Sequence, residues 1–152
     1  MKKMKKLLLY VGMIIFCNLL SPTFVQAQEM KAKKYDNPEW KTIGFIKFKS
    51  GKVDRAKEII KNYYMKAGEK AATPGPAMLI DLKTGEWDMM VLWDMKGGIE
   101  EMNWEMSPND VKWMTAMNDI AGGGDKAKTI MDEFSSLVDR ETSYIGKIAM
   151  LK

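Results

Sequence analysis

The sequence contains no histidine, and its single cysteine, Cys17, lies close to the N-terminus. Without histidine, the chain lacks the side chain that most often moves protons near neutral pH. Without a second cysteine it forms no intrachain disulfide, and the usual nitrogen and sulfur ligands of structural zinc are missing. These absences exclude the commonest catalytic arrangements of small domains. We therefore predict neither a metal ion nor a cofactor, and the sequence defines no particular reaction.

The first 27 residues have the three parts of a secretion signal. Four lysines precede a mostly apolar run over residues 7–20, and small residues at Val25-Gln26-Ala27 suit a cleavage site. The run is short for a membrane-spanning helix, which needs about 20 residues. We expect residues 1–27 to be removed, which leaves an exported protein, periplasmic or secreted, with no stable membrane anchor. A flexible arm over 28–40 and one domain over 41–152 would then follow.

The net charge of +4 belongs to the segment that we expect to be removed. Because residues 1–27 hold four lysines and no acidic residue, residues 28–152 carry no net charge. A nucleic-acid-binding protein needs a clustered basic surface, so we exclude nucleic acid as a partner. A neutral protein also has little charge to keep its copies apart.

The remaining pattern alternates strands with helices. Strands are expected over 42–49, 77–82, 87–95 and 143–151, where β-branched and aromatic residues gather. Helices are expected over 52–70 and 125–138, a short one over 99–106, and another from Ser107-Pro108 to Ala121, with Ser107 and Asp110 as caps. We expect Asp125 to cap the last helix. The order predicts an α+β, ferredoxin-like β-α-β-β-α-β domain with a four-stranded antiparallel sheet.

Two of the strands are apolar on both faces. Residues 89–93 are apolar without alternation, and Ile145 and Ile148 to Leu151 place apolar groups on each side of the last strand. A sheet that is covered on one side only should alternate apolar and polar residues. We therefore expect helices on one face and a second copy of the chain on the other, in a two-fold symmetric homodimer.

The segment TIGFIKFK, followed by Ser50-Gly51-Lys52-Val53-Asp54-Arg55-Ala56 at the start of a helix, resembles the dimeric α/β-barrel domains related to the antibiotic biosynthesis monooxygenases. The resemblance implies that two ferredoxin-like units pair their sheets into a barrel, with a ligand cavity between sheet and helices. Haem-degrading members hold iron with a histidine, which this chain lacks. Other members oxidise quinols or polyketides without metal or flavin, so the resemblance implies a cofactor-independent monooxygenase as an alternative function.

Tryptophan and methionine are concentrated between residues 87 and 117. Alternation predicts that Trp87, Met89 and Trp93 share one face of a strand, and Trp113 and Met117 are neighbours on a helix. Such residues either line a cavity for a small apolar or aromatic molecule or fill the core and the dimer interface. The candidate ligand-binding residues are Tyr63, Trp87, Met89, Trp93, Trp113, Met117 and Asn118.

Few residues remain for catalysis. Asp88 could serve as a base if burial raised its pKa, and Asn103 beside Trp104 is the kind of pair that a cofactor-independent oxygenase of this resemblance would use. For Asp88 the favoured alternative is a strand end in solvent, and for Asn103 it is a surface amide on a short helix. Methionine pairs at 102 and 106 and at 114 and 117 are spaced for Cu(I), but without histidine or cysteine we do not favour copper. We expect a homodimeric domain that binds a small apolar or aromatic molecule.

Overall fold

The computed structural model describes residues 30–149, so the expected signal peptide lies outside the described residues. The chain divides into two units, residues 1–34 and 35–152, and the fold described below belongs to the second. Within residues 30–149, no helix has the length and hydrophobicity needed to span a bilayer.

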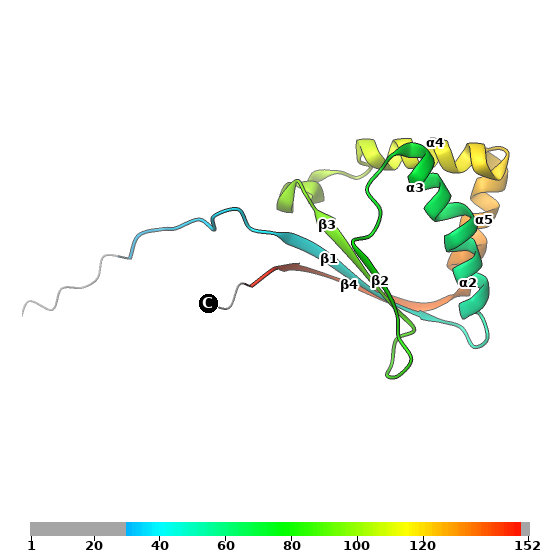
Figure 1. Ribbon diagram of the computed structural model, residues 1–152, viewed down its shortest axis with the longest axis horizontal. Helices are drawn as coiled ribbons and strands as arrows, with labels where there is room; N and C mark the ends of the chain where they lie inside the picture. Colours follow the sequence, from blue (N-terminus) through cyan, green and yellow to red (C-terminus); the bar gives the residue numbers. More distant parts are fainter. Residues whose placement is uncertain (1–29, 150–152) are drawn as a thin grey trace, which may run out of the picture. The chain divides into compact units, whose positions relative to one another are not determined.

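Four strands form one antiparallel sheet, which confirms the predicted α+β fold. They are β1 (Trp40–Phe48), β2 (Met78–Asp81), β3 (Met89–Met95) and β4 (Val138–Lys147). Their order across the sheet is β2-β3-β1-β4, with every neighbouring pair antiparallel. This is the arrangement of a ferredoxin-like domain, and the helices cover one face of it (Figure 1).

The strand register separates the side chains into two faces. Gly44 lies opposite Val91 on one side and Ser143 on the other, and Thr42 lies opposite Trp93 and Ile145. Because Cβ atoms alternate along a strand, these residues share the helix-facing side with Ile46 and Phe48, which pack in the core. The odd-numbered residues of β1 therefore point to the opposite side.

The segment expected as one helix over 52–70 is interrupted by a π-turn. It consists of α2 (Val53–Ile59), η1 (Ile60–Tyr64) and α3 (Met65–Ala71). A π-turn adds a residue to one helical turn and shifts the face that the helix presents. Both Tyr63 and Tyr64 consequently pack against buried clusters, where a regular helix favours one of them.

Three further helical segments follow β3: the short 3-10 helix η2 (Gly98–Asn103), α4 (Pro108–Ala121) and α5 (Gly124–Leu137). Ser107 and Asp110 form the predicted capping box at the start of α4. The expected cap by Asp125 is wrong, because Gly123 occupies the N-cap of α5 and no side chain caps that helix. Gly123 has φ 130°, a backbone conformation that favours glycine.

The core has two parts. One lies against the sheet and contains the buried residues Phe48, Ala56, Ile59, Met89 and Leu137. The other lies among the helices and contains Ala67, Ala116, Met117 and Ala127. Edge-to-face and tilted ring contacts connect the two parts, from Phe48 to Phe134, from Phe134 to Tyr64 and from Tyr64 to Trp113.

The last strand begins five residues earlier than expected and ends at Lys147, so the prediction that Ile148 and Ala149 belong to it is wrong; residues 150 and 151 lie outside the described residues. Residues 139–142 are polar, so the sequence pattern favoured a loop there. In the structure β4 starts at Val138, directly after α5, and stays paired with β1 from Val138 opposite Phe48 to Lys147 opposite Trp40. Backbone pairing along the full length of β1 therefore decides the strand boundary, rather than side-chain hydrophobicity.

Candidate ligand-binding site

Part of the helix-facing side of the sheet is left uncovered. Trp93, on β3, is 42% exposed, although the neighbouring Met89 and Met95 on the same side of the strand are buried. Leu79 on β2 is 42% exposed and Ile145 on β4 is 41% exposed. We call the surface formed by Thr42, Gly44, Leu79, Trp93 and Ile145 the helix-side patch.

Gly44 lies near the middle of the helix-side patch and leaves space above it. A Cβ atom built at Gly44 would have the main-chain oxygen of Val91, at 3.9 Å, as its near neighbour. No helix atom among the described residues comes within 4 Å of that position. A methyl group at Gly44 would therefore meet no helix atom within 4 Å, whereas Val91 opposite it, and Met89 and Phe48 further along, pack in the core.

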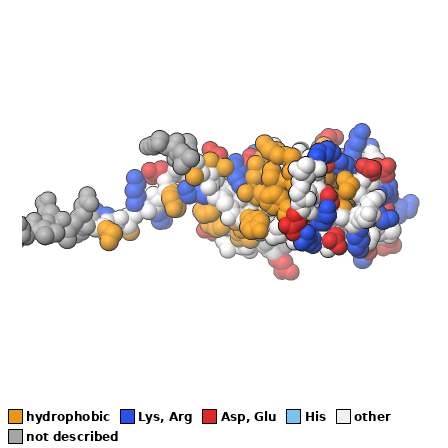
Figure 2. Space-filling model, turned by 90° about the horizontal axis from the view of Figure 1, so that it is seen from below, with side chains coloured by type: hydrophobic (Ala, Val, Ile, Leu, Met, Phe, Trp, Pro, Cys, Tyr) orange, Lys and Arg blue, Asp and Glu red, His pale blue; other side chains and the backbone are white. Residues whose placement is uncertain are grey.

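The opposite side of the sheet carries a second apolar surface. Its members come from all four strands, and we call them the outer sheet face: Ile43, Phe45, Met78, Ile80, Met90, Leu92 and Tyr144. Tyr144 is 58% exposed, and its ring contacts that of Phe45 with centroids 6.3 Å apart. Figure 2 shows hydrophobic side chains gathered on this side, with acidic and basic side chains around them.

The charged groups that border the outer sheet face are paired within the chain. Lys41 Nζ lies 2.7 Å from Asp94 Oδ1, and Lys47 Nζ lies 2.9 Å from Asp88 Oδ1. Arg140 lies 2.6 Å from Glu86 Oε1 and also stands over the ring of Trp87, at 5.0 Å. The border of this apolar surface is therefore electrically balanced before any partner binds.

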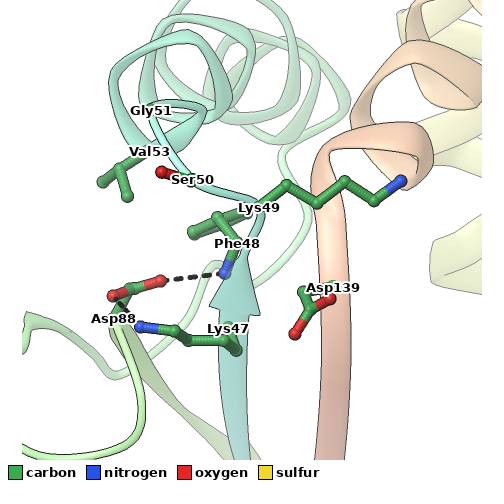
Figure 3. Close-up of a pocket in the computed structure, with 8 residues that line it drawn as sticks. All are labelled: Lys47, Phe48, Lys49, Ser50, Gly51, Val53, Asp88 and Asp139. Atoms are coloured by element: carbon green, nitrogen blue, oxygen red, sulfur yellow. Dashed lines mark hydrogen bonds and ion pairs between the residues drawn. The ribbon is translucent and has the colours of Figure 1, made fainter.

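An open pocket of about 440 Å³ lies where β1 continues into α2, lined by residues 47–51, Val53, Asp88 and Asp139 (Figure 3). The carboxylate of Asp88 accepts hydrogen bonds from the main-chain N–H of Phe48 and from Lys47 Nζ, both at 2.9 Å. Lys49 points away from Asp88 and donates to the carbonyl of Ser136 at 2.7 Å. Asp88 and both lysines are thus occupied by partners that hold the chain in place.

Trp93 and Trp87 lie on opposite sides of the sheet, so the prediction that they share one face is wrong. The ring of Trp87 is 6.0 Å from that of Phe45, which belongs to the outer sheet face. The reason is that β3 begins at Met89, and the alternation of a strand does not extend to a residue before it. Of the two, Trp93 alone belongs to the helix-side patch.

The other predicted ligand-binding residues lie in the two core clusters or beside the turn between α4 and α5. Met89 and Met117 are fully buried in the two separate core clusters, so they fill the interior and do not line open space. Trp113 is half-buried, and its indole N–H donates to the carbonyl of Tyr64 at 3.1 Å. Tyr63 packs against both clusters, and the carbonyl of Asn118 accepts the N–H of Gly123 at the turn between α4 and α5.

None of the candidate catalytic residues lies in a setting that tunes it for proton transfer near neutral pH. The N–H of Phe48, and then Lys47, hold the pKa of Asp88 below its ordinary value of 3.8, which is the opposite of the predicted rise. Burial raises the pKa of Tyr64 to about 12. Asn103 donates to Glu100 at 2.6 Å on the exposed η2, and Trp104 is 59% exposed. Among the described residues, no three or more histidine, cysteine, aspartate or glutamate side chains are grouped to hold a metal ion.

The sequence predicts Trp93 as a site residue but does not indicate the residues around it. Thr42, Gly44, Leu79 and Ile145 come from three other strands, and only the register brings them beside Trp93. The one signal in the sequence was the glycine within an apolar strand, which often marks a close approach or an open space above a sheet.

Comparison with known proteins supports the fold and leaves the reaction open. No family model and no curated protein sequence matches the chain. Two crystal structures of NIPSNAP family proteins from Agrobacterium tumefaciens resemble it, one of them described as having unknown function. The first has a TM-score of 0.52 at 7% identity, and the alignment covers 80% of this chain and 97% of that one. The second has a TM-score of 0.50 at 9% identity and covers 80% and 96%. At such identities the likeness shows the ferredoxin-like fold alone, and neither structure is named as a monooxygenase.

Proposed function

We propose that the protein is an exported homodimeric domain that binds a small apolar or aromatic molecule at the helix-side patch. The observation that carries the proposal is the exposure of Trp93 together with Leu79 and Ile145 on the side of the sheet that helices cover elsewhere. Large apolar side chains that cluster in an exposed patch mark binding surfaces. The space above Gly44 gives a flat molecule room to lie against the indole.

The outer sheet face supports the homodimer. It is apolar across four strands, and its bordering charges are already paired within the chain. A second copy of this chain presents the same surface. If the border carried unpaired charges of one sign, the equivalent residues of the two subunits would repel each other across the two-fold axis. A balanced border removes that repulsion. The N-terminal pattern of lysines, apolar run and small residues supports export.

Ligand binding is tested by the indole N–H signals in a nitrogen–proton NMR spectrum of the purified protein. We expect naphthalene-sized neutral aromatics to shift the signal of Trp93 and to leave that of Trp87 unchanged, because the two indoles lie on opposite sides of the sheet. Trp93→Phe assigns the signal, and Trp87→Phe is the matched control.

A second variant blocks the patch without removing the tryptophan. Gly44→Phe places a ring in the space above the sheet, and we expect it to abolish the Trp93 shift while the other indole signals keep their positions. If a broad panel of such aromatics leaves the Trp93 signal unmoved, or if Gly44→Phe binds them as the wild type does, the proposed function is wrong.

A further inference from the structure

The helix-side patch is free of charge across the middle of the sheet. On the helix-facing side of the two central strands, every described residue is uncharged: Trp40, Thr42, Gly44, Ile46, Phe48, Met89, Val91, Trp93 and Met95. An ionised group bound against this surface would lose water without gaining a counter-charge from either strand.

The charged residues on the same side belong to the edge strands, and most of them are occupied. Asp81 of β2 is paired with Lys57 and Lys83, each at 2.5 Å. Lys147 of β4 stands 4.1 Å from the centre of the Tyr35 ring. Glu141 of β4 is exposed and lies four positions from Ile145 on the same side, where its negative charge opposes an anionic ligand.

The patch does carry polar groups in the form of hydroxyls. Thr42 lies between Trp93 and Ile145 in the register, and Ser143 lies beside Gly44. Within the described chain, neither hydroxyl takes part in a side-chain hydrogen bond. A hydroxyl both donates and accepts, so it matches a neutral carbonyl or hydroxyl oxygen of a ligand.

From this arrangement we infer the chemical class of the ligand: a neutral, planar molecule whose edge bears a carbonyl or hydroxyl oxygen, held against Trp93 with that oxygen hydrogen-bonded to Thr42. The inference rests on the proposed function, because it assumes that the helix-side patch binds a small molecule. Carboxylates of the same shape are disfavoured, because the two central strands offer no counter-charge and the nearby Lys147 stands over the Tyr35 ring. The oxygen-free hydrocarbon loses only the hydrogen bond.

Three naphthalenes substituted at the same ring position separate these possibilities at neutral pH. Acetylnaphthalene is neutral and has a carbonyl, naphthoate has nearly the same shape with a negative charge, and ethylnaphthalene has no oxygen. We expect acetylnaphthalene to bind at least about tenfold more tightly than naphthoate, measured by calorimetry and by the Trp93 indole signal. Ethylnaphthalene should bind about threefold to tenfold more weakly than acetylnaphthalene, the range that one hydrogen bond supports.

Thr42→Val isolates the hydroxyl, because valine keeps the β-branched shape that suits a strand. It should lower the affinity for acetylnaphthalene about threefold to tenfold and leave that for ethylnaphthalene unchanged. Lys147→Gln should leave naphthoate binding unchanged, because that ammonium group stands over the Tyr35 ring.

Each outcome decides a separate point. If naphthoate binds as tightly as acetylnaphthalene, the inference that the ligand is neutral is wrong. If Thr42→Val lowers the affinities for acetylnaphthalene and ethylnaphthalene equally, the proposed hydrogen bond to Thr42 is wrong. If none of the three compounds moves the Trp93 signal, the proposed function itself fails and the ligand class fails with it.

Discussion

Replacing Leu92 by lysine tests whether a second copy covers the outer sheet face. Leu92 is half-buried on β3, opposite Ile43 of β1 and Met78 of β2, and so lies among apolar neighbours on both sides. Its side chain points away from the helices, so the lysine can extend into solvent in a single copy. In a two-fold dimer, the same change places two ammonium groups in one apolar interface.

The expected effect on association is large. An uncompensated buried charge costs about 3–5 kcal/mol, and two-fold symmetry counts it twice, so the lower limit is roughly 6 kcal/mol per dimer. At 1.4 kcal/mol for each tenfold change, this corresponds to about four orders of magnitude in the dimer dissociation constant. A nanomolar dissociation constant would then become about 10 μM, so that the protein is largely monomeric below that concentration.

Sedimentation velocity over a range of protein concentrations measures this change directly. Val111→Lys is the control, because it also replaces an apolar side chain by lysine, here an exposed one on α4 and away from both sides of the sheet. We expect Leu92→Lys to be monomeric and Val111→Lys to dimerise like the wild type. A Leu92→Lys protein that associates as tightly as the wild type, or a wild type that is monomeric at high concentration, would refute the reasoning.

Four further predictions concern stability and processing. Met117→Ala should lower the free energy of unfolding by about 2–5 kcal/mol in chemical denaturation, because the side chain is fully buried among helices. Asp88→Asn should lower the free energy of unfolding at neutral pH. The difference from the wild type should shrink as the pH falls below about 4, because a carboxylate whose pKa is lowered in the folded state stabilises the fold only while it is ionised. An unchanged deficit in acid would contradict that assignment. Gly44→Ala should raise the free energy of unfolding by about 0.5–1 kcal/mol in the same assay, since the nearest atom to the added Cβ lies at an ordinary van der Waals distance. A clear decrease in stability would show that the space above Gly44 is filled. The intact mass of the exported protein should correspond to a chain beginning at Gln28, whereas a retained N-terminus would refute the expected cleavage.

The fold was predictable because its local signals agree with one another. The capping box at Ser107 and Asp110 starts α4 where the sequence places it, and apolar runs place β1, β2 and β3 and the second half of β4. The order of these elements leaves few antiparallel arrangements that bury the apolar side of each helix. The π-turn over Ile60–Tyr64 could not be predicted, because tertiary packing of both Tyr63 and Tyr64 decides it rather than local helix propensity.

The candidate site was only partly predictable, because its residues are distant in the sequence. The tryptophan and methionine positions between 87 and 117 suggested a single cluster, and the structure separates them into the helix-side patch, the outer sheet face and two core clusters. Trp87 is the clearest example, since one break in strand pairing before Met89 moves it to the other side of the sheet. Thr42 and Ile145 join Trp93 through backbone register, which the sequence pattern does not encode residue by residue.

The most direct test of the account is a titration of the purified protein with acetylnaphthalene, followed by the indole signals of Trp93 and Trp87. These two side chains lie on opposite sides of the same sheet. We expect a saturable shift of the Trp93 signal that disappears in Gly44→Phe, with the Trp87 signal unaffected. A shift at Trp87 alone, or at neither residue, would contradict the claim that the helix-facing side of the sheet holds the ligand.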